Sequence, residues 1–416
     1  KGGHILHMLR NYLGDDAFFG GLNGYLKEYE FQHAEADQLR IAMEKVCGQD
    51  LKWFFDQWFF GAGHPDVNIS YFQDSEELQV VITQNQVFED QQMFKLPILI
   101  DLHFTNGTSE RKEVFMDQEE QIFTFALSDS LLWANVDAEK VLLWQKTDNR
   151  PAQWWKHQME NGKHLLDQLE ALAWLEENPE SISADWIQLG ASHSHGFMHL
   201  KTLEVIESAD VPEDYIPFIS QVVESTPDTE AESYGIDLWF ELDPASEELK
   251  AAVIDRLNND LSYYVLGSSL SALSNISPEE AKPFADQLRN EKNTDIQMAV
   301  IQSYLTTNKE EGLKMLSDAL ENAEDFEQYE LLFIYGDWVL AQPLEDQLEA
   351  VSMFENVARN GQQWWIRYQG YNFLAGIKNG LENNPEYSED AQRIADLLKE
   401  LKEQEEDEQL LKYIQE

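Results

Sequence analysis

The sequence predicts a multidomain, mostly α-helical protein that contains one small antiparallel β-sandwich. Three observations predict it: helical periodicity up to residue 65, strand-like alternation over 66–150, and a weakly repeated helical pattern over 151–416. With 416 residues, 43% of them hydrophobic, the chain can form two or three domains with apolar cores. We therefore expect domains at 1–65, 66–150 and 151–416.

The chain is strongly acidic, with 78 Asp and Glu residues against 29 Lys and Arg residues, a net charge of −49. Such a polyanion repels nucleic-acid phosphates and anionic lipids, so we expect neither as a partner. The acidic residues are spread along the chain, which favours a solvated surface over a specific attraction for cationic ligands. The apolar runs are far shorter than the ~18 residues of a transmembrane helix, so we expect a soluble protein. Its compartment stays open, with a periplasmic or other extracytoplasmic location as one option.

Residues 1–63 carry apolar residues at helical spacing. The first segment ends at Gly14, and Asp15 is predicted to cap the next helix. That helix is expected to turn four apolar residues inward: Phe18, Phe19, Leu22 and Leu26. Two further helical segments, ADQLRIAMEKVCG and DLKWFFDQWFF, follow before the GAGHP step ends the helical run.

Short stretches rich in β-branched and aromatic residues then predict seven strands. They are VNISYF, LQVVITQ, FKLPILIDLHF, ERKEVFM, QIFTFAL, LLWANVD and VLLWQ. Because no helical pattern separates them, an antiparallel sandwich is the expected arrangement. Asn106-Gly107 within TNGT predicts a hairpin, since both residue types tolerate positive φ angles.

Residues 151–416 return to helical periodicity, and seven segments share a weak repeat whose starts lie roughly 30 to 37 residues apart. The segments begin at His164, His195, Glu232, Ser262, Asp295, Glu327 and Trp364. Each opens with a polar or small residue near an aromatic or apolar pair and continues with apolar residues at helical spacing. The repeat predicts stacked helix pairs in a HEAT-like α-solenoid that ends in a charged helical tail.

Candidate catalytic and metal-binding residues are few. No His is followed by Glu, so the His-Glu-x-x-His motif of zinc peptidases is absent, as are a nucleophile elbow and a phosphate loop. Two histidine groups could in principle bind a metal: His4 with His7, and His193 with His195 and His199. We favour ordinary polar positions on helices for both. The lone Cys47 excludes an internal disulfide, and an inert packed thiol is favoured over a nucleophile.

The twelve Trp residues are compatible with sugar stacking, and hence with a carbohydrate-binding sandwich. This alternative rests on Trp content alone. Trp154-Trp155 and Trp364-Trp365 are expected instead to wedge between helices.

The opening KGGHILHMLRNYLGDDAFFGGLNGYL and the later DLKWFFDQWFFGAGHPDVNISY resemble the M1 family of zinc aminopeptidases. That family has a Lys-Gly helix start, a Leu-Gly-Asp-x-x-Phe helix, and a Gly-x-Asp-Leu-x-x-Phe-Phe-x-Gln-Trp helix that ends in Gly-x-Pro. The corresponding residues here are 1–2, 13–18, 48–58 and 63–65, in the same order. The resemblance implies that 1–65 forms the C-terminal helices of a thermolysin-like catalytic domain. A β-sandwich and a HEAT-like helical domain commonly follow in that family.

In that family the zinc ligands and the general-base Glu precede the Lys-Gly step, and the catalytic Tyr lies two residues before the Lys. The loop that binds the substrate's amino group also precedes it. The resemblance therefore implies a C-terminal fragment that begins just after the catalytic Tyr, with no catalytic, metal or substrate-binding residue to transfer. The residues expected nearest to the active site are Lys1, Gly2, Gly3 and His4. The two glycines either allow a close backbone approach or simply begin the helix.

The resemblance implies that the parent protein is a zinc metallo-aminopeptidase that removes N-terminal residues from peptides. Its expected partners are peptide substrates and the missing N-terminal part of the same polypeptide. The chain by itself is expected to bind no zinc and to be inactive, while it supports and covers the active-site cleft. The alternative is a non-catalytic α-solenoid scaffold that binds a protein or peptide partner.

Overall fold

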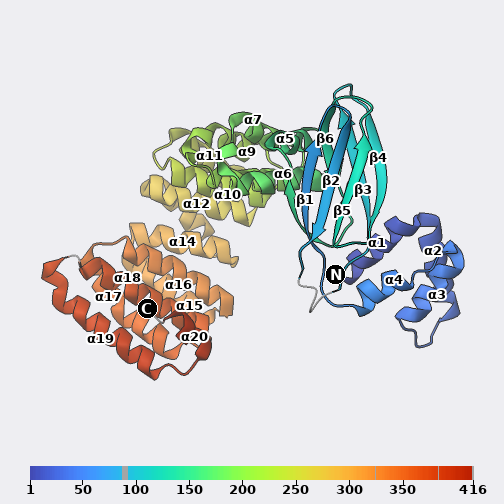
Figure 1. Cartoon of the computed structure of the whole chain (residues 1–416). Coiled ribbons are helices and arrows are strands. Elements are labelled where there is room, and N and C mark those ends of the chain that lie inside the picture. Colours follow the sequence, from blue (N-terminus) through green and yellow to red (C-terminus); the bar gives the residue numbers. More distant parts are fainter. Residues whose placement is uncertain (87–91, 324, 383, 415–416) are drawn as a thin grey trace. The chain divides into compact units, whose positions relative to one another are not determined.

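The computed structural model describes residues 1–86, 92–323, 325–382 and 384–414 (Figure 1). They form two compact units, Lys1–Leu189 with Ser208–Asp210 and Gly190–Glu207 with Val211–Glu416. The multidomain, mostly α fold with a small β-sandwich is confirmed. The division into three domains stays a prediction. The boundary between the two compact units falls between residues 189 and 190, inside the predicted helical domain 151–416.

Residues 1–60 form short helices: α1 Gly2–Leu13, α2 Asp15–Glu28, α3 Ala36–Cys47, α4 Lys52–Phe55 and the π-helical turn η1 Asp56–Phe60. Gly14 ends α1 at a φ of 77°, as predicted. The prediction that Asp15 caps α2 is wrong, because Asp15 is the first residue of that helix. Its carboxylate instead pairs with Arg10, with Nε and Oδ1 2.7 Å apart.

The inward face predicted for α2 is only partly correct. Phe18 is buried, but Phe19 is 50% exposed and Leu26 60% exposed. A Cβ added at Gly21 would lie 2.5 Å from Sδ and 3.0 Å from Cα of Met43, so α3 approaches α2 closely at this glycine. The packing face therefore centres on Phe18 and Gly21, which turns Phe19 and Leu26 outward.

The sandwich consists of β1 Asp66–Gln73, β2 Glu77–Gln84, β3 Leu96–Phe104, β4 Ser109–Met116, β5 Glu120–Ala126, β6 Leu131–Val136 and β7 Gln145–Asn149. One sheet has the order β5-β2-β1-β7 and the other β4-β3-β6. Pairing is antiparallel as expected, except that β7 runs parallel to β1. Alternate residues of β2 and β3 are fully or almost fully buried in the core, which matches the predicted period of two.

The seventh strand was predicted at VLLWQ and is wrong in position, since β7 begins only at Gln145. The backbone N–H groups of Val141 and Leu142 donate to the carboxylate of Asp137, at 3.0 and 3.1 Å. Both apolar side chains are buried, at 8% and 7% exposure. The segment is therefore a buried loop. Its apolar side chains pack in the interior, but they form no strand.

The hairpin between β3 and β4 is confirmed, with a different turn. Gly107 has a φ of 83°, and its N–H donates to the carbonyl of Phe104 at 3.0 Å. Asn106 is not among the residues with positive φ. The turn therefore uses one left-handed glycine, as in longer hairpin loops, rather than the two successive positive φ angles of a two-residue turn.

Helices α5 Ala152–Asn161 and α6 Leu165–Glu177 lie in the first unit, followed by η2 Pro179–Ser181 and by α7 Ala184–Ala191. In the second unit one row of helices stacks in succession (Figure 1). It contains α8 Gly196–Glu207, α10 Thr229–Leu242, α12 Tyr263–Ile276, α14 Thr294–Thr307, α16 Asp325–Leu340 and α18 Trp364–Glu382. These helices start within three residues of six of the seven predicted repeat starts, so those six mark this row. The first predicted start, at His164, falls instead on α6 of the first unit.

The remaining helices of the second unit alternate with this row along the chain. They are η3 Pro212–Tyr215, α9 Ile216–Ser225, α11 Glu247–Asn259, α13 Pro278–Leu288, α15 Lys309–Asn322, α17 Leu344–Asn360, η4 Pro385–Tyr387, α19 Ser388–Gln404 and α20 Glu408–Tyr413. Helix α17 lies against α18 at Gly370, where an added Cβ would come within 2.5 Å of Ala358 N and 2.6 Å of Phe354 O.

We predict that Gly370→Ala destabilises the second unit by about 1–3 kcal/mol, because backbone atoms of α17 cannot yield to a methyl group. Gly380→Ala in the same helix is the matched control: its Cβ would meet only side-chain atoms at 3.6 Å. It should be neutral or stabilising by about 0.5–1 kcal/mol. Urea unfolding followed by circular dichroism measures both. Equal stability of the two variants would contradict the close packing.

Candidate functional site

Helix α1 begins at the four residues that the sequence places nearest to an active site. Lys1 precedes the helix and accepts the Ile5 N–H at 3.0 Å through its carbonyl. An added Cβ at Gly2 or Gly3 would meet nothing within 4 Å among the described residues. Among the described residues, nothing approaches the two glycines closely.

His4 connects α1 to the loop between β6 and β7. Its Nε2 lies 2.8 Å from the carbonyl oxygen of Val141, a hydrogen bond that the ring donates. Asp137, the first residue of the same loop, stabilises it: its carboxylate accepts the N–H groups of Val141 and Leu142. Asp137 and Lys140 have left-handed φ angles of 57° and 54°. A sharply folded loop thus presents one carbonyl to the first helix.

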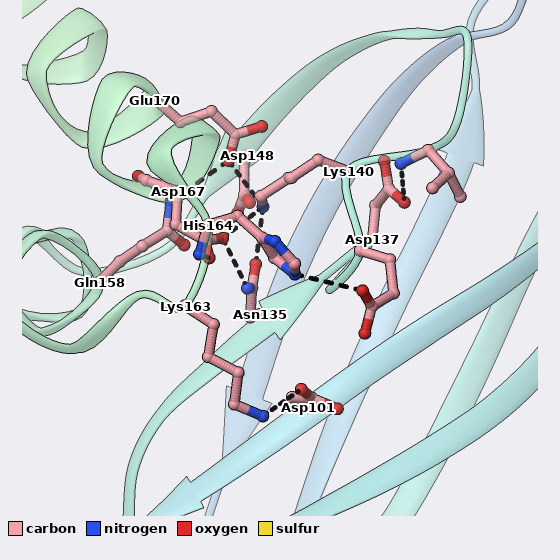
Figure 2. A network of polar contacts seen from close by, with 12 residues as sticks. Asp101, Asn135, Asp137, Lys140, Asp148, Gln158, Lys163, His164, Asp167 and Glu170 are labelled. Carbon is pink, nitrogen blue, oxygen red and sulfur yellow. Dashed lines mark hydrogen bonds and ion pairs between the residues drawn. The ribbon is translucent and has the colours of Figure 1, made fainter. Parts of the chain in front are cut away.

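The loop is anchored by the ammonium group of Lys140, whose side chain is only 4% exposed. Figure 2 shows it pointing between Asn135 of β6 and two acidic residues of α6. Its Nζ lies 2.8 Å from Asn135 Oδ1, 3.3 Å from Asp167 Oδ1 and 2.8 Å from Glu170 Oε2. Asn135 in turn donates to Asp167 Oδ1 at 2.9 Å. One buried cation therefore joins the sandwich, the loop and α6.

A second basic side chain, Lys146 of β7, approaches Glu170 to 2.8 Å. Burial would raise the pKa of Glu170, but Lys146 and Lys140 outweigh it and hold the pKa at about 2. Burial lowers the pKa of Lys140, and the charge of Lys146 adds to this effect against the attraction of Glu170 and Asp167. Gln158 of α5 completes the cluster by donating to the Asp167 carbonyl at 2.8 Å.

Sequence analysis missed this cluster. Its members come from β6, β7, the loop between them, α5 and α6, so no spacing within one element connects them. The one available signal was Lys140 beside the apolar run VLLW, where a charged residue must either be exposed or be paired.

We predict that Lys140→Met destabilises the first unit by about 3 kcal/mol, since the buried carboxylate of Asp167 loses its cation and Glu170 keeps only Lys146. Lys156→Met is the matched control, because its ion pair with Asp185 is exposed, at 30% and 61%. That variant should change stability by less than about 1 kcal/mol. Denaturant midpoints measure both. An unchanged midpoint for Lys140→Met would contradict the anchoring role.

The cluster also makes the first unit sensitive to acid. The pKa of Glu170 is lowered to about 2, so its ion pairs stabilise the fold above its unfolded pKa of about 4.3. That stability is lost as the pH falls from about 4.3 to about 2. In Lys140→Met the native pKa rises, so the loss of stability across this window should be smaller than in the wild type.

The histidine rings of the two groups make local hydrogen bonds to protein atoms. His199 Nε2 lies 2.7 Å from the carbonyl of His193, whose own ring accepts the N–H of His195 at 3.0 Å. His4 bonds Val141, and the His7 ring lies 3.4 Å from the amide of Asn11. Among the described residues no three His, Cys, Asp or Glu side chains are grouped as metal ligands would be. These residues therefore do not fit the zinc site that the resemblance implies.

Cys47 ends α3, and its partly exposed Sγ lies 3.8 Å from the carbonyl of Gln49. No basic residue bonds to it among the described residues. The contact fits a packed thiol better than an activated nucleophile.

The second unit carries a polar cavity of about 230 Å³ along the row of stacked helices, lined by residues of α10, α12, α14 and α16. Two carboxylates line it, those of Asp237 and Asp295. Desolvation raises the pKa of Asp237 to about 6, although a 3.3 Å hydrogen bond from Ser268 opposes the shift. The Asp237 side chain is nevertheless exposed to solvent. It lies in a concave surface, where neighbouring protein displaces water without covering the carboxylate.

The first 58 residues match the model of the peptidase family M1 domain. Aminopeptidase N of Lactococcus lactis is 32% identical over 88 residues, which are 21% of this chain and 10% of that protein. Aminopeptidase 2 of Candida albicans is 25% identical over 162 residues, 38% of this chain and 17% of that protein. The matched parts thus span only 10% and 17% of the length of these relatives. The similarity to M1 aminopeptidases thus lies in the N-terminal part of the chain.

Among solved structures, the aminopeptidase A of Legionella pneumophila in complex with aspartic acid is similar at 16% identity and a TM-score of 0.49. The similarity covers 96% of this chain and 51% of that one. In the part of the chain that the structure describes, none of the helices is both long and apolar enough to span a membrane.

Proposed function

We propose that this chain is the part of an M1 zinc aminopeptidase that supports and covers the active-site cleft. The zinc ligands, the general-base Glu and the catalytic Tyr would lie in another part of the same polypeptide, N-terminal to the Lys1-Gly2 step. The match of residues 1–58 to the M1 domain is the observation that carries this proposal. The proposed domains are 1–65 for the end of the catalytic domain, 66–150 for the sandwich and 151–416 for the helical domain.

The surface of the N-terminal helices supports the proposal. Several large apolar side chains are exposed there: Phe19 at 50%, Leu26 at 60%, Phe31 at 99%, Val46 at 49% and Phe60 at 61%. Several exposed large apolar side chains within about 40 residues favour a surface that other polypeptide covers. Further residues of a catalytic domain are the covering that the family match favours.

In such an enzyme a zinc ion would polarise the substrate carbonyl and activate a water molecule. The contribution of this chain is to hold the start of α1. The His4 bond to Val141 fixes the first turn of that helix, and the buried Lys140 cluster fixes the loop that carries Val141. Lys1, Gly2, Gly3 and His4 are therefore proposed as the residues that lie nearest to the reacting groups, with none of them catalytic.

We predict that this chain alone, residues 1–416, folds but does not hydrolyse aminoacyl-p-nitroanilides and binds no stoichiometric zinc. Metal analysis after dialysis against a weak chelator, together with a chromogenic assay, tests it. The full-length polypeptide serves as the positive control in both measurements. One tightly bound zinc ion per chain, or turnover by the chain alone, would overturn the proposal.

In the full-length protein, His4→Ala should lower kcat by about 10-fold with little change in KM, because a displaced helix start costs transition-state geometry. His7→Ala is the matched control, since His7 lies on the same helix and hydrogen-bonds Asn11, and its one contact with His4 is a ring-edge contact at a centroid distance of 6.4 Å that leaves the Val141 bond in place. It should leave kcat within about twofold of the wild type. Equal effects of both substitutions would contradict a positioning role for His4.

The second candidate function is a non-catalytic scaffold that binds a peptide or protein. The cavity beside Asp237 and Asp295 on the stacked helices favours it. The sequence that precedes Lys1 in the gene separates the two candidates. A His-Glu-x-x-His motif, with a Tyr two residues before Lys1, supports the enzyme, and a reading frame without them supports the scaffold.

A further inference from the structure

A cavity of about 440 Å³ lies between the last three helices of the second unit, α18, α19 and α20. This volume falls in the range of about 300–1,000 Å³ that small-molecule sites occupy. Its apolar lining comes from Ala375, Ala395, Leu398 and Ile414. Its polar lining comes from Tyr368, Tyr371, Asn372, Lys378, Lys399, Lys402 and Tyr413. The mixture of apolar walls and convergent polar groups is typical of a ligand site.

The charge of this lining is opposite to that of the chain. All three charged lining residues are Lys, and the described lining includes no Asp or Glu. The whole chain carries 78 acidic residues against 29 basic ones, so most surfaces of this protein should present more carboxylates than ammonium groups. A lining with ammonium groups alone therefore indicates a preference for anions.

Two of these ammonium groups are unpaired. Lys399 and Lys402 lie one turn apart on α19, and neither forms an ion pair with any described residue. The nearby acidic residues Glu400 and Glu405 are paired with Arg359 and Arg367 instead. Across the cavity, Lys378 of α18 has a partly exposed contact with Glu382 at 3.3 Å. Two cations are thus available without breaking an existing pair.

Tyrosines supply hydrogen-bond donors and an aromatic wall. Tyr371 is 4% exposed, and burial, with the charge of Glu405 adding to it, raises the pKa of its hydroxyl to about 12. The hydroxyl therefore stays protonated and can donate at neutral pH. Tyr368 and Tyr413 lie with ring centroids 5.8 Å apart, and Tyr413 stacks on Trp364 at 5.3 Å. This wall offers a flat apolar surface to the body of a ligand.

We propose that the cavity between α18, α19 and α20 binds a small organic anion, a carboxylate or phosphate group carried on an aromatic or apolar body. Lys399 and Lys402 bind the anionic group, Tyr371 donates to it, and Tyr368 and Tyr413 pack against the body. The charge of the lining excludes a cationic ligand, and its apolar part disfavours a bare inorganic ion. The site lies wholly in the second unit and does not depend on the proposed peptidase function.

Isothermal titration calorimetry with the chain tests this proposal at about 0.15 M salt, where the long-range repulsion from the net charge is screened beyond about 8 Å. The probes are phenyl phosphate and phenylacetate, with benzyl alcohol and benzylamine as neutral and cationic analogues of similar size. Both anions should bind at least about 10-fold more tightly than benzyl alcohol, and benzylamine should not bind. The comparison between the two anions shows whether a phosphate or a carboxylate is preferred.

The double substitution Lys399→Met and Lys402→Met should weaken anion binding by at least about 10-fold. Lys412→Met is the matched control, because Lys412 lies on α20 but is not a lining residue. It should change the affinity by less than about twofold. Tyr371→Phe removes one hydroxyl without changing the shape of the core and should weaken binding by about 3- to 10-fold. It provides a second test if the double variant unfolds.

Either of two results would overturn the proposal. The first is anion affinity no higher than that of benzyl alcohol in the wild type. The second is an equal loss of affinity in Lys412→Met and in the double variant, which would show that general surface charge attracts the probes.

Discussion

The first unit depends on one buried charge interaction, that of the Lys140 ammonium group with Asp167 and Glu170. A lysine with a 4% exposed side chain is tolerated only where carboxylates and an amide surround it. These partners come from α6 and β6, so the ion cluster fixes the sandwich against α6. The loop that carries Lys140 also carries Val141, which binds His4. The start of α1 is therefore held in place through the same loop.

The second unit is stabilised differently, by repeated apolar contacts between successive helices rather than by one buried ion cluster. Each helix of the row from α8 to α18 contacts the next, and apolar residues at helical spacing form its buried seam. At the C-terminal end of the row, α20 packs beside α18 and adds aromatic residues to its surface. Repetition ends there, and the arrangement of α18, α19 and α20 leaves the Lys- and Tyr-lined cavity. The Lys- and Tyr-lined cavity thus lies at the end of the repeat array, where the regular stacking of helices stops.

The family resemblance and the structure bear on function in different ways. Ordered motifs over the first 65 residues point to M1 aminopeptidases, and the family match of residues 1–58 agrees. The structure adds the contacts through which the first helix is held, and among the described residues it groups no three His, Cys, Asp or Glu side chains as metal ligands would be. In the proposed function these residues support the reacting groups rather than supply them.

The sequence by itself determined the element types, six of the seven strand positions, and the row of stacked helices, because these follow from local periodicity and glycine stops. It also carried the family resemblance, since motifs are local strings. Only the tertiary structure decided which face of α2 is buried, where β7 begins, and that Lys140 meets Asp167 and Glu170. Those outcomes depend on close approach between distant segments, at Gly21 and in the loop after β6. Periodicity within one segment carries no information about its partner, so contacts of this kind are set only when the chain folds.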